Sequence, residues 1–361
     1  MKILVIKFRN IGDVLLVTPL LHNLKRFYPQ AKIDVAINSD AKDILIENPH
    51  IDNLIIYERD NINNLPRVKR IFWELIFFLD FVRKSYDLVI NLTEGDRGGL
   101  ISKLTLSKIK IGYLSKNKLL KNVYTNFLPK QDFRHTVETN LDPLRLLNIP
   151  IKNKKVEVFC TPEDHEFIDL HISNIGRYVH IHPVSRWLFK CIADKTMAKI
   201  IDFCQLKLGF KVVITAAPIE AEIKKVNSII SMCQSNPLNL SGQLSLKQTI
   251  ALNQKASCFI GVDTAIMHMS AANDTPVLAF FGPSGADHWG PWDNQILESG
   301  YTKRNGIQHM GKHTVISESR DCQPCGKDGC GGSKVSDCLM GMNFKEIKKA
   351  VIKLTQLENL N

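Results

Sequence analysis

Two segments of the sequence place residues that can carry chemistry where a helix begins. In the segment Gly261–His268, a carboxylate at Asp263 is followed by a hydroxyl at Thr264 and, four residues later, an imidazole at His268. The first N–H groups of a helix lack carbonyl partners and lie at the positive end of its dipole. We therefore expect this turn, with the backbone at Ala265, to suit a diphosphate. Alternatively, His268 is an ordinary helix histidine whose ring is satisfied by hydrogen bonds.

The second such segment follows the first apolar stretch of the chain and runs from Lys7 to Asp13. Gly12 lets the backbone turn sharply and lets a ligand approach closely. Asp13 falls in the first turn of the next predicted helix, whose dipole favours an ionised carboxylate. Such a carboxylate can take a proton from a hydroxyl as a general base. The alternative is that Asp13 only caps its helix.

Two further polar sites follow strands in the second half of the chain. Ser185, Arg186 and Lys190 lie in one loop, where their side chains can reach phosphate oxygens; the alternative is an ordinary basic loop. Glu220 and Glu222 open a predicted helix, where a carboxylate commonly accepts ribose hydroxyls. A solvated helix face is the alternative for these two residues.

The elements that must position these residues alternate between short apolar strands and amphipathic helices. This rhythm is typical of parallel βαβ units with helices on both sides of a sheet. Since 361 residues suffice for two cores, we predict an α/β protein of two domains. Residues 149–176 show little periodicity and are predicted to connect the halves. The predicted strands are 3–6, 33–37, 54–57, 88–92, 178–182, 211–215, 258–260 and 277–281.

The composition favours anionic partners. The chain has 47 basic and 36 acidic residues and a net charge of +11, which suits phosphorylated substrates or an acidic membrane face. The basic residues are scattered and no zinc finger or RNA-recognition signature is present, so we expect no nucleic-acid partner. Without a signal peptide or a run of about 18 apolar residues, the protein is expected to be cytoplasmic.

One segment, Ile71–Val82, is unusually rich in aromatic and aliphatic residues and has basic residues on both sides. A helix of this kind either packs on its own sheet or rests on anionic lipid. The two interpretations are compatible if one edge of the helix is exposed, and both stay open at this stage.

Four cysteines lie close together near the C-terminus, at positions 322, 325, 330 and 338. Thiolates at such spacing can hold a structural zinc ion. The only CxxC pair is the first, however, and free thiols in an ordered loop or a disulfide are also open. The metal state of this cluster is therefore left unknown, and we expect no catalytic role for it.

Taken together, these motifs resemble glycosyltransferase family 9, the heptosyltransferases of lipopolysaccharide core assembly. The resemblance covers essentially the whole chain in order and spacing. The segments that carry it are Arg9-Asn10-Ile11-Gly12-Asp13, Ser185-Arg186 with Lys190, Gly261–His268 and Phe281-Gly282-Pro283. The opening turn and the cysteine segment look most like the branch that adds the third heptose. Two departures are Cys191-Ile192, where many relatives carry a Trp, and Ala265, where Gly is common.

The resemblance implies a GT-B fold, in which two Rossmann-like domains with parallel sheets face a cleft. It implies an acceptor-binding domain at 1–160, a nucleotide-sugar-binding domain at 175–340, and a helix at 341–361 that packs back toward the first domain. The implied donor is ADP-L-glycero-D-manno-heptose, the acceptor is the lipid-linked inner core of lipopolysaccharide, and no cofactor is expected. The protein would work at an anionic membrane surface, peripherally on the inner face of the inner membrane.

The resemblance also assigns roles to individual residues. Asp13 is the implied catalytic base, and Arg9, Asn10 and Gly12 are expected to contact the acceptor. Donor binding is assigned to Ser185, Arg186, Lys190, Glu222, Asp263, Thr264, Ala265 and His268. Rival interpretations are a family relative that transfers heptose I, heptose II or another sugar, and a nucleotide-sugar-binding protein without catalysis.

Overall fold

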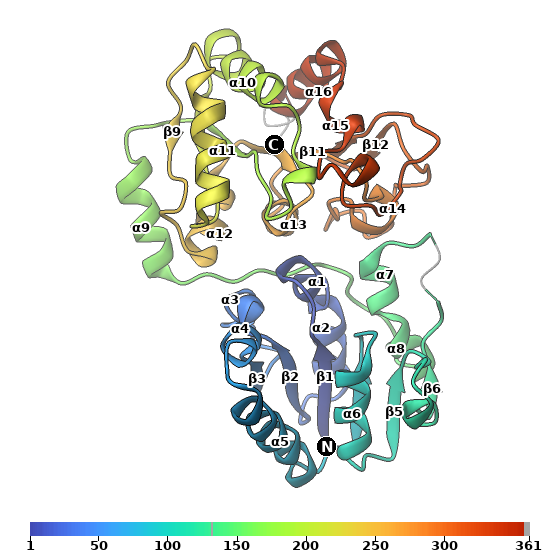
Figure 1. Ribbon diagram of the computed structural model, residues 1–361. Coiled ribbons are helices and arrows are strands. Elements are labelled where there is room, and N and C mark those ends of the chain that lie inside the picture. The colour runs from blue at the N-terminus through green and yellow to red at the C-terminus, as the bar shows by residue number, and fades with distance from the viewer. Residues whose placement is uncertain (131–132, 357–361) are drawn as a thin grey trace. The chain divides into compact units, whose positions relative to one another are not determined.

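The computed structural model describes residues 1–130 and 133–356. The chain forms two compact units (Figure 1). The N-terminal unit comprises Met1–Asp132 and Thr136–Val156, and the C-terminal unit comprises Phe133–His135 and Glu157–Asn361. Each unit is built around its own sheet.

The N-terminal unit holds a six-stranded sheet in the order β3-β2-β1-β4-β5-β6. All of its strand pairs are parallel, and the order is that of Rossmann folds. The central strands are buried on both faces, which explains their continuous apolar sequence. The strands are β1 (Lys2–Lys7), β2 (Lys32–Asn38), β3 (Asn53–Tyr57), β4 (Leu88–Asn91), β5 (Ile109–Gly112) and β6 (Asn126–Phe127).

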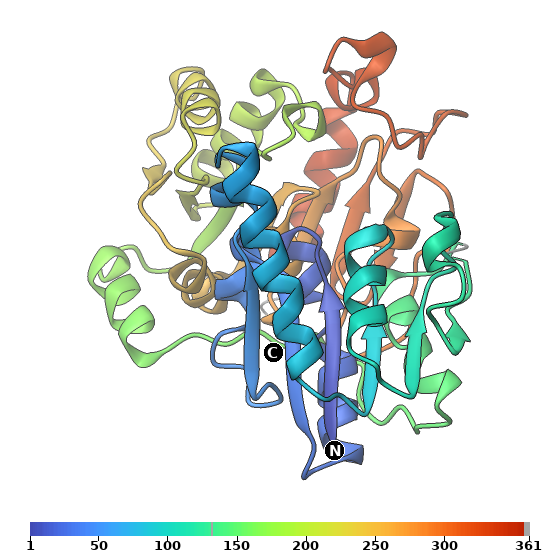
Figure 2. The ribbon, with the colours of Figure 1, turned by 60° about the horizontal axis from the view of Figure 1, so that its bottom comes forward.

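Helices connect these strands. In Figure 2, α5, the long medium-blue helix, and α6, in teal, lie in front of the sheet, and the two contact each other. The helical elements are α1 (Ile11–Leu15), α2 (Thr18–Phe27), η1 (Ser39–Ala41), α3 (Lys42–Leu45), α4 (Arg59–Asn63), α5 (Arg67–Arg83), α6 (Asp96–Leu104), η2 (Lys118–Leu120), α7 (Thr136–Asn140) and α8 (Asp142–Leu146).

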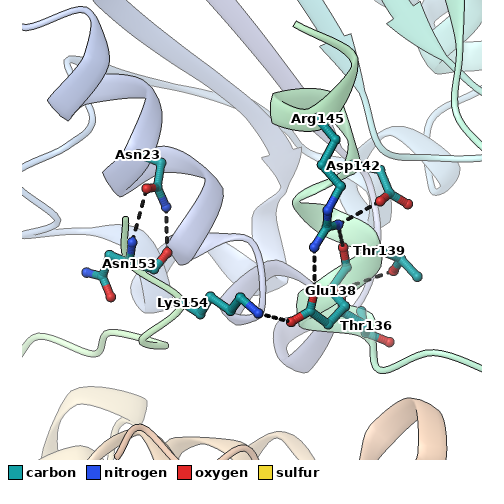
Figure 3. Close-up of polar contacts among 8 residues, drawn as sticks. All are labelled: Asn23, Thr136, Glu138, Thr139, Asp142, Arg145, Asn153 and Lys154. Atoms are coloured by element: carbon teal, nitrogen blue, oxygen red, sulfur yellow. Dashed lines mark hydrogen bonds and ion pairs between the residues drawn. The ribbon is translucent and has the colours of Figure 1, made fainter. Parts of the chain in front are cut away.

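Residues 136–156 are fastened to the N-terminal unit by a polar network (Figure 3). Asn23 of α2 accepts from the backbone N–H of Lys152 at 2.8 Å and of Asn153 at 3.2 Å. Glu138 of α7 pairs with Arg145 of α8 and with Lys154, the latter at 2.7 Å. Asn23 thus ties residues 152–153 to α2, and Lys154 ties the same segment to α7. Asn140 of α7 takes part in the site described below.

The C-terminal unit holds a seven-stranded sheet in the order β12-β13-β11-β10-β7-β8-β9. Only the β12–β13 pair is antiparallel among its described pairs. The five strands β9-β8-β7-β10-β11 repeat the Rossmann order of the first unit. The strands are β7 (Tyr178–His182), β8 (Lys211–Ile214), β9 (Leu238–Asn239), β10 (Cys258–Val262), β11 (Val277–Phe280), β12 (Ile307–Met310) and β13 (His313–Ile316).

The last described helix, α16, buries Ile347, Val351 and Leu354 in the core of the C-terminal unit and contacts β11 and β13. Its predicted packing toward the first domain stays a prediction, and residues 357–361 lie outside the described residues. The helical elements of this unit are α9 (Pro162–Ile172), η3 (Leu188–Lys190), α10 (Asp194–Asp202), η4 (Phe203–Lys207), α11 (Glu220–Ser231), α12 (Leu246–Lys255), α13 (Ala265–Ala272), α14 (Ala286–Trp289), η5 (Cys330–Gly332), α15 (Asp337–Met340) and α16 (Phe344–Gln356).

The predicted connector contains a helix that its weak periodicity did not reveal. α9 starts at a capping box, in which the Thr161 side chain and Asp164 each satisfy the other's backbone N–H. Ile168 is its only buried residue, which explains the faint apolar pattern. Across residues 1–130 and 133–356, none of the helices has the length and apolar character needed to cross a bilayer.

Candidate functional site

The residues singled out in the sequence follow the carboxyl ends of strands: β1 in the N-terminal sheet, and β7, β8 and β10 in the C-terminal sheet. In folds of this order, ligands bind where the strand order reverses. That point lies between β1 and β4 in the N-terminal unit and between β7 and β10 in the C-terminal unit. Asp13 follows β1; Lys190 follows β7, and Asp263 follows β10. The residues around Asp13 and those around Lys190 and Asp263 therefore lie at the carboxyl-end edge of their sheets, where ligands are expected to bind.

Asp13 lies in the first turn of α1 and is half-buried. Asn10, not Asp13, holds the N-cap position, and the Asn10 side chain makes no capping hydrogen bond. The interpretation of Asp13 as a simple N-cap is therefore wrong. Arg9 and Asn10 are exposed and Gly12 is half-buried beside them, so the turn presents a carboxylate with polar neighbours.

Lys7 begins this turn, but the sequence motifs assign it no role. It ends β1, is buried, and its Nζ donates to Asn140 Oδ1 at 3.2 Å and to the Leu92 carbonyl at 3.4 Å. Burial lowers the pKa of Lys7 to about 8, although the negative charge of Asp13 opposes this shift. Asn140 also donates to the Leu16 carbonyl at 2.9 Å. The sequence signal that could have identified Lys7 is a single lysine at the end of an otherwise apolar strand.

In the C-terminal unit, Lys190 of η3 and Asp263, in the turn after β10, form an ion pair of 2.6 Å. Ser284 Oγ donates to the same carboxylate oxygen at 2.5 Å. Burial alone would raise the pKa of Asp263, but Lys190 and Ser284 outweigh it and hold the pKa below its usual value. Asp263 therefore fixes the direction of Lys190, whose side chain stays 24% exposed and accessible to a ligand. Ser284 was not predicted.

Thr264 is the N-cap of α13, and its side chain accepts from the Met267 N–H at 3.4 Å. The next N–H groups, of Ala265 and Ile266, open the helix and have no carbonyl partners within it. The turn therefore combines a helix N-terminus with the Lys190 ammonium, which is tied to the adjacent Asp263. Together they form a positively charged group suited to phosphate oxygens.

His268 is buried on α13, and its pKa falls to about 4, chiefly through burial. Within the described part of the chain, its Nδ1 has no hydrogen-bond partner. The nearby charges of Asp263 and Lys190 act on it in opposite directions, so His268 is a neutral imidazole beside the ion pair.

Glu222 is buried in the first turn of α11, whereas Glu220 on the same helix is exposed. The Glu222 carboxylate accepts from the Ala217 N–H at 3.0 Å. Burial raises its pKa, while this hydrogen bond and the charge of Arg186 counteract the shift. Arg186 is exposed, and Ser185 Oγ accepts from the Trp187 N–H at 3.2 Å. The structure thus relates Glu222, not Glu220, to the basic loop.

The cysteine segment supports the loop that carries Ser284. The N–H groups of Cys325 and Gly326 donate to the Pro283 carbonyl at 3.0 and 2.9 Å. Gln323 Nε2 donates to the Gly282 carbonyl at 2.9 Å. All nine cysteines are free thiols, so the disulfide alternative is not realised. Burial, followed by the neighbouring cysteines, raises the pKa of Cys338 to about 11.

Buried histidines of the C-terminal unit make its stability depend on pH. Burial lowers the pKa of His180 and His268 to about 4 and of His182 to about 3, and it also lowers that of His313. Below the ordinary value near 6.5 the unfolded chain binds more protons than the native one, so stability falls as pH drops from 6.5 toward 4. Each unit by which a pKa differs between the folded and unfolded chain changes the free energy of unfolding by about 1.4 kcal/mol.

We therefore expect hydrogen exchange of β7 and β10 to accelerate steeply between pH 6.5 and 4.5, after correction for intrinsic rates. His182→Asn should flatten this slope even if it lowers stability at pH 7. The exposed His171 provides the control, and His171→Gln should leave the slope unchanged. A slope that is the same in His182→Asn and the unsubstituted protein would contradict the assignment.

Comparison with known proteins identifies the class and then the family. A glycosyltransferase family 9 structure from Veillonella parvula matches with a TM-score of 0.79 at 19% identity, covering 99% of this chain and 97% of that one. Escherichia coli heptosyltransferase WaaC with ADP matches with a TM-score of 0.72 at 15% identity, covering 98% and 100%. The fold is therefore that of the GT-B glycosyltransferases.

Sequence similarity is more specific than the fold. Residues 78–316 match the family described as glycosyltransferase family 9 (heptosyltransferase). Lipopolysaccharide heptosyltransferase 3 of Escherichia coli is 31% identical over 294 residues, which cover 80% of this chain and 85% of that protein. This chain belongs to glycosyltransferase family 9 and is a glycosyltransferase, as the sequence motifs predicted.

Proposed function

We propose that this protein transfers L-glycero-D-manno-heptose from its ADP derivative to the inner core of lipopolysaccharide, as the third heptose. The observation that carries the proposal is the ion pair of Lys190 with Asp263 beside the N-terminus of α13, in a chain of this family. The similarity to heptosyltransferase 3 supports the step. The ADP named in the WaaC structure supports the nucleotide.

The residues of the C-terminal unit are proposed to bind the donor. Lys190, Arg186 and the first N–H groups of α13 would neutralise the diphosphate, with Ser185 and Thr264 as hydroxyl partners. Glu222 would accept the ribose hydroxyls, and His268 would present its neutral ring. As the bond to the anomeric carbon breaks, negative charge grows on the departing ADP, and pre-positioned cations and N–H groups stabilise it.

The residues of the N-terminal unit are proposed to bind and activate the acceptor. Arg9, Asn10 and Gly12 would contact the acceptor, and Asp13 would take the proton of its attacking hydroxyl. That oxygen forms the new bond to the anomeric carbon from the side opposite ADP, so the configuration inverts. Lys7, buried next to this turn, would help to keep Asp13 ionised. The enzyme would act while peripherally bound to the inner face of the inner membrane.

The test is an assay of the purified protein with ADP-heptose and lipopolysaccharides truncated after successive heptoses. A mass gain of one heptose on the acceptor that already holds two, with release of ADP, is the expected result. Gain on an earlier truncation would assign a different step. ADP binding without transfer to any of these acceptors would contradict the proposal and favour a non-catalytic binding protein.

Glu222→Gln is expected to raise the dissociation constant of ADP by about tenfold, because an amide accepts the ribose hydroxyls more weakly than a carboxylate does. Isothermal titration calorimetry with ADP and with the pyrophosphate ion measures the effect. Only ADP binding should weaken, since pyrophosphate has no ribose. Glu220→Gln is the matched control on the same turn of α11, and equal losses in the two variants would argue against the ribose role.

A further inference from the structure

Helix α5 has two apolar faces, and among residues 1–130 and 133–356 only one of these faces is packed against other side chains. On the inner face, Trp73 and Phe77 stack with ring centroids 5.3 Å apart, and Phe77 lies 5.3 Å from Phe81. These rings pack against the core that includes Tyr57 of β3 and Leu4 of β1. The inner face therefore accounts for the attachment of α5 to the sheet.

The outer face is apolar as well, and it is exposed over the full length of the helix. At about 100° per residue its members fall within an arc of about 140°. We call this set the outer face of α5; it consists of Val68 (80% exposed), Ile71 (59%), Phe72 (64%), Leu75 (55%), Ile76 (53%), Leu79 (48%) and Val82 (42%). Single exposed apolar residues are ordinary, but a continuous stripe marks an interaction surface.

Positive charge borders this stripe. Arg67, Lys69 and Arg83 are exposed. By the same helical geometry Lys69 lies just beyond one edge of the outer face, Arg83 lies just inside that edge, and Arg67 lies beyond the other edge. Arg70 and Lys84 are paired to Glu74 and Asp80 on the helix itself. Residues 67–84 thus hold five basic and two acidic side chains, a net charge of +3.

We propose that the outer face of α5 docks the protein on a bilayer that contains anionic lipid. An apolar stripe with cations along its edges matches acyl chains below a layer of negative headgroups. A second copy of the chain fits less well, because an α5–α5 contact would bring two positively charged helices together. The docking itself is inferred from α5 alone. Its biological role, which is to bring the enzyme to a lipid-linked acceptor, rests on the proposed function.

Co-sedimentation with vesicles tests the proposal. Wild-type protein should partition onto vesicles of phosphatidylcholine with 30% phosphatidylglycerol and much less onto pure phosphatidylcholine. Phe72→Ser/Leu75→Ser should lower this partitioning at least tenfold, and Lys69→Glu/Arg83→Glu should lower it on the anionic vesicles. The matched control is Leu119→Ser/Leu170→Ser, which removes two residues that are 79% and 74% exposed elsewhere and should bind as wild type does.

Any of three results would overturn the proposal. The wild-type protein could fail to bind anionic vesicles, the Phe72→Ser/Leu75→Ser variant could bind as strongly as wild type, or the control variant could lose as much binding as the docking variant. A dimer in sedimentation velocity that Phe72→Ser/Leu75→Ser dissociates would instead assign the face to a second copy. Circular dichroism and ADP titration show that each variant is folded.

Transfer to a delipidated core oligosaccharide separates this inference from the proposed function. The docking variants should keep wild-type rates on that water-soluble acceptor and lose rate on vesicle-borne lipopolysaccharide. If the wild-type protein transferred heptose to neither acceptor, the proposed function would be refuted. The vesicle-binding result would still decide whether α5 docks on lipid.

Discussion

Asp13→Asn is expected to reduce the rate of heptose transfer by about 10³-fold, within the range typical of lost general-base catalysis. The amide cannot accept the proton of the attacking hydroxyl, although it nearly preserves the size of the side chain. The dissociation constant of ADP should change less than twofold, because the proposed donor residues belong to a unit with a separate core. Single-turnover kinetics and calorimetry measure the two quantities.

Asp43 offers a matched control for this substitution. It is an exposed carboxylate in the first turn of α3, in the same unit as Asp13. Asp43→Asn should retain the wild-type rate and ADP affinity. If Asp13→Asn turned over as fast as the unsubstituted enzyme, Asp13 could not be the base, and the proton would have to go to another group.

Lys190→Met is expected to lower the rate of transfer by about 10²- to 10³-fold, since a charge that stabilises a leaving group is worth that much when removed. The same substitution leaves Asp263 buried without its cation, and losing one partner of a buried pair costs on the order of 3 kcal/mol of stability. Two different effects therefore follow from one substitution, and the experiment must separate them.

The double variant Lys190→Met/Asp263→Asn makes the separation. Without the buried carboxylate, unfolding stability should recover most of the loss, because the two residues are coupled in the sense of a double-mutant cycle. The rate should stay low, since the cation is still missing. Recovery of both stability and rate would show that Lys190 acts only by holding the loop, and would contradict its proposed contact with the diphosphate.

The central strands could be predicted because strands buried on both faces must be continuously apolar. All eight predicted strands are present as β1–β4, β7, β8, β10 and β11. The missed strands, including β5, β6 and β9, have two to four residues each. A segment this short takes its conformation from the strand beside it, and its own sequence shows too few repeats to reveal a period.

In the candidate site, too, some features could be predicted from the sequence and others could not. The sequence determined which residues carry charge at the ends of buried strands, and their spacing was enough to indicate the family. It could not pair them: Lys190 meets Asp263 across 73 positions, and Lys7 meets Asn140 across 133. It also gave α5 two apolar faces without saying which would be covered.

The tertiary structure decided which residues pair and which face of α5 is covered, because contacts between distant segments depend on the spatial order of the strands in each sheet. Local periodicity records only whether a side chain prefers burial, not which partner it meets. The order of the strands placed β10 next to β7 and thereby joined Lys190 to Asp263. Packing of Trp73, Phe77 and Phe81 on the sheet likewise determined that the opposite face of α5 is exposed.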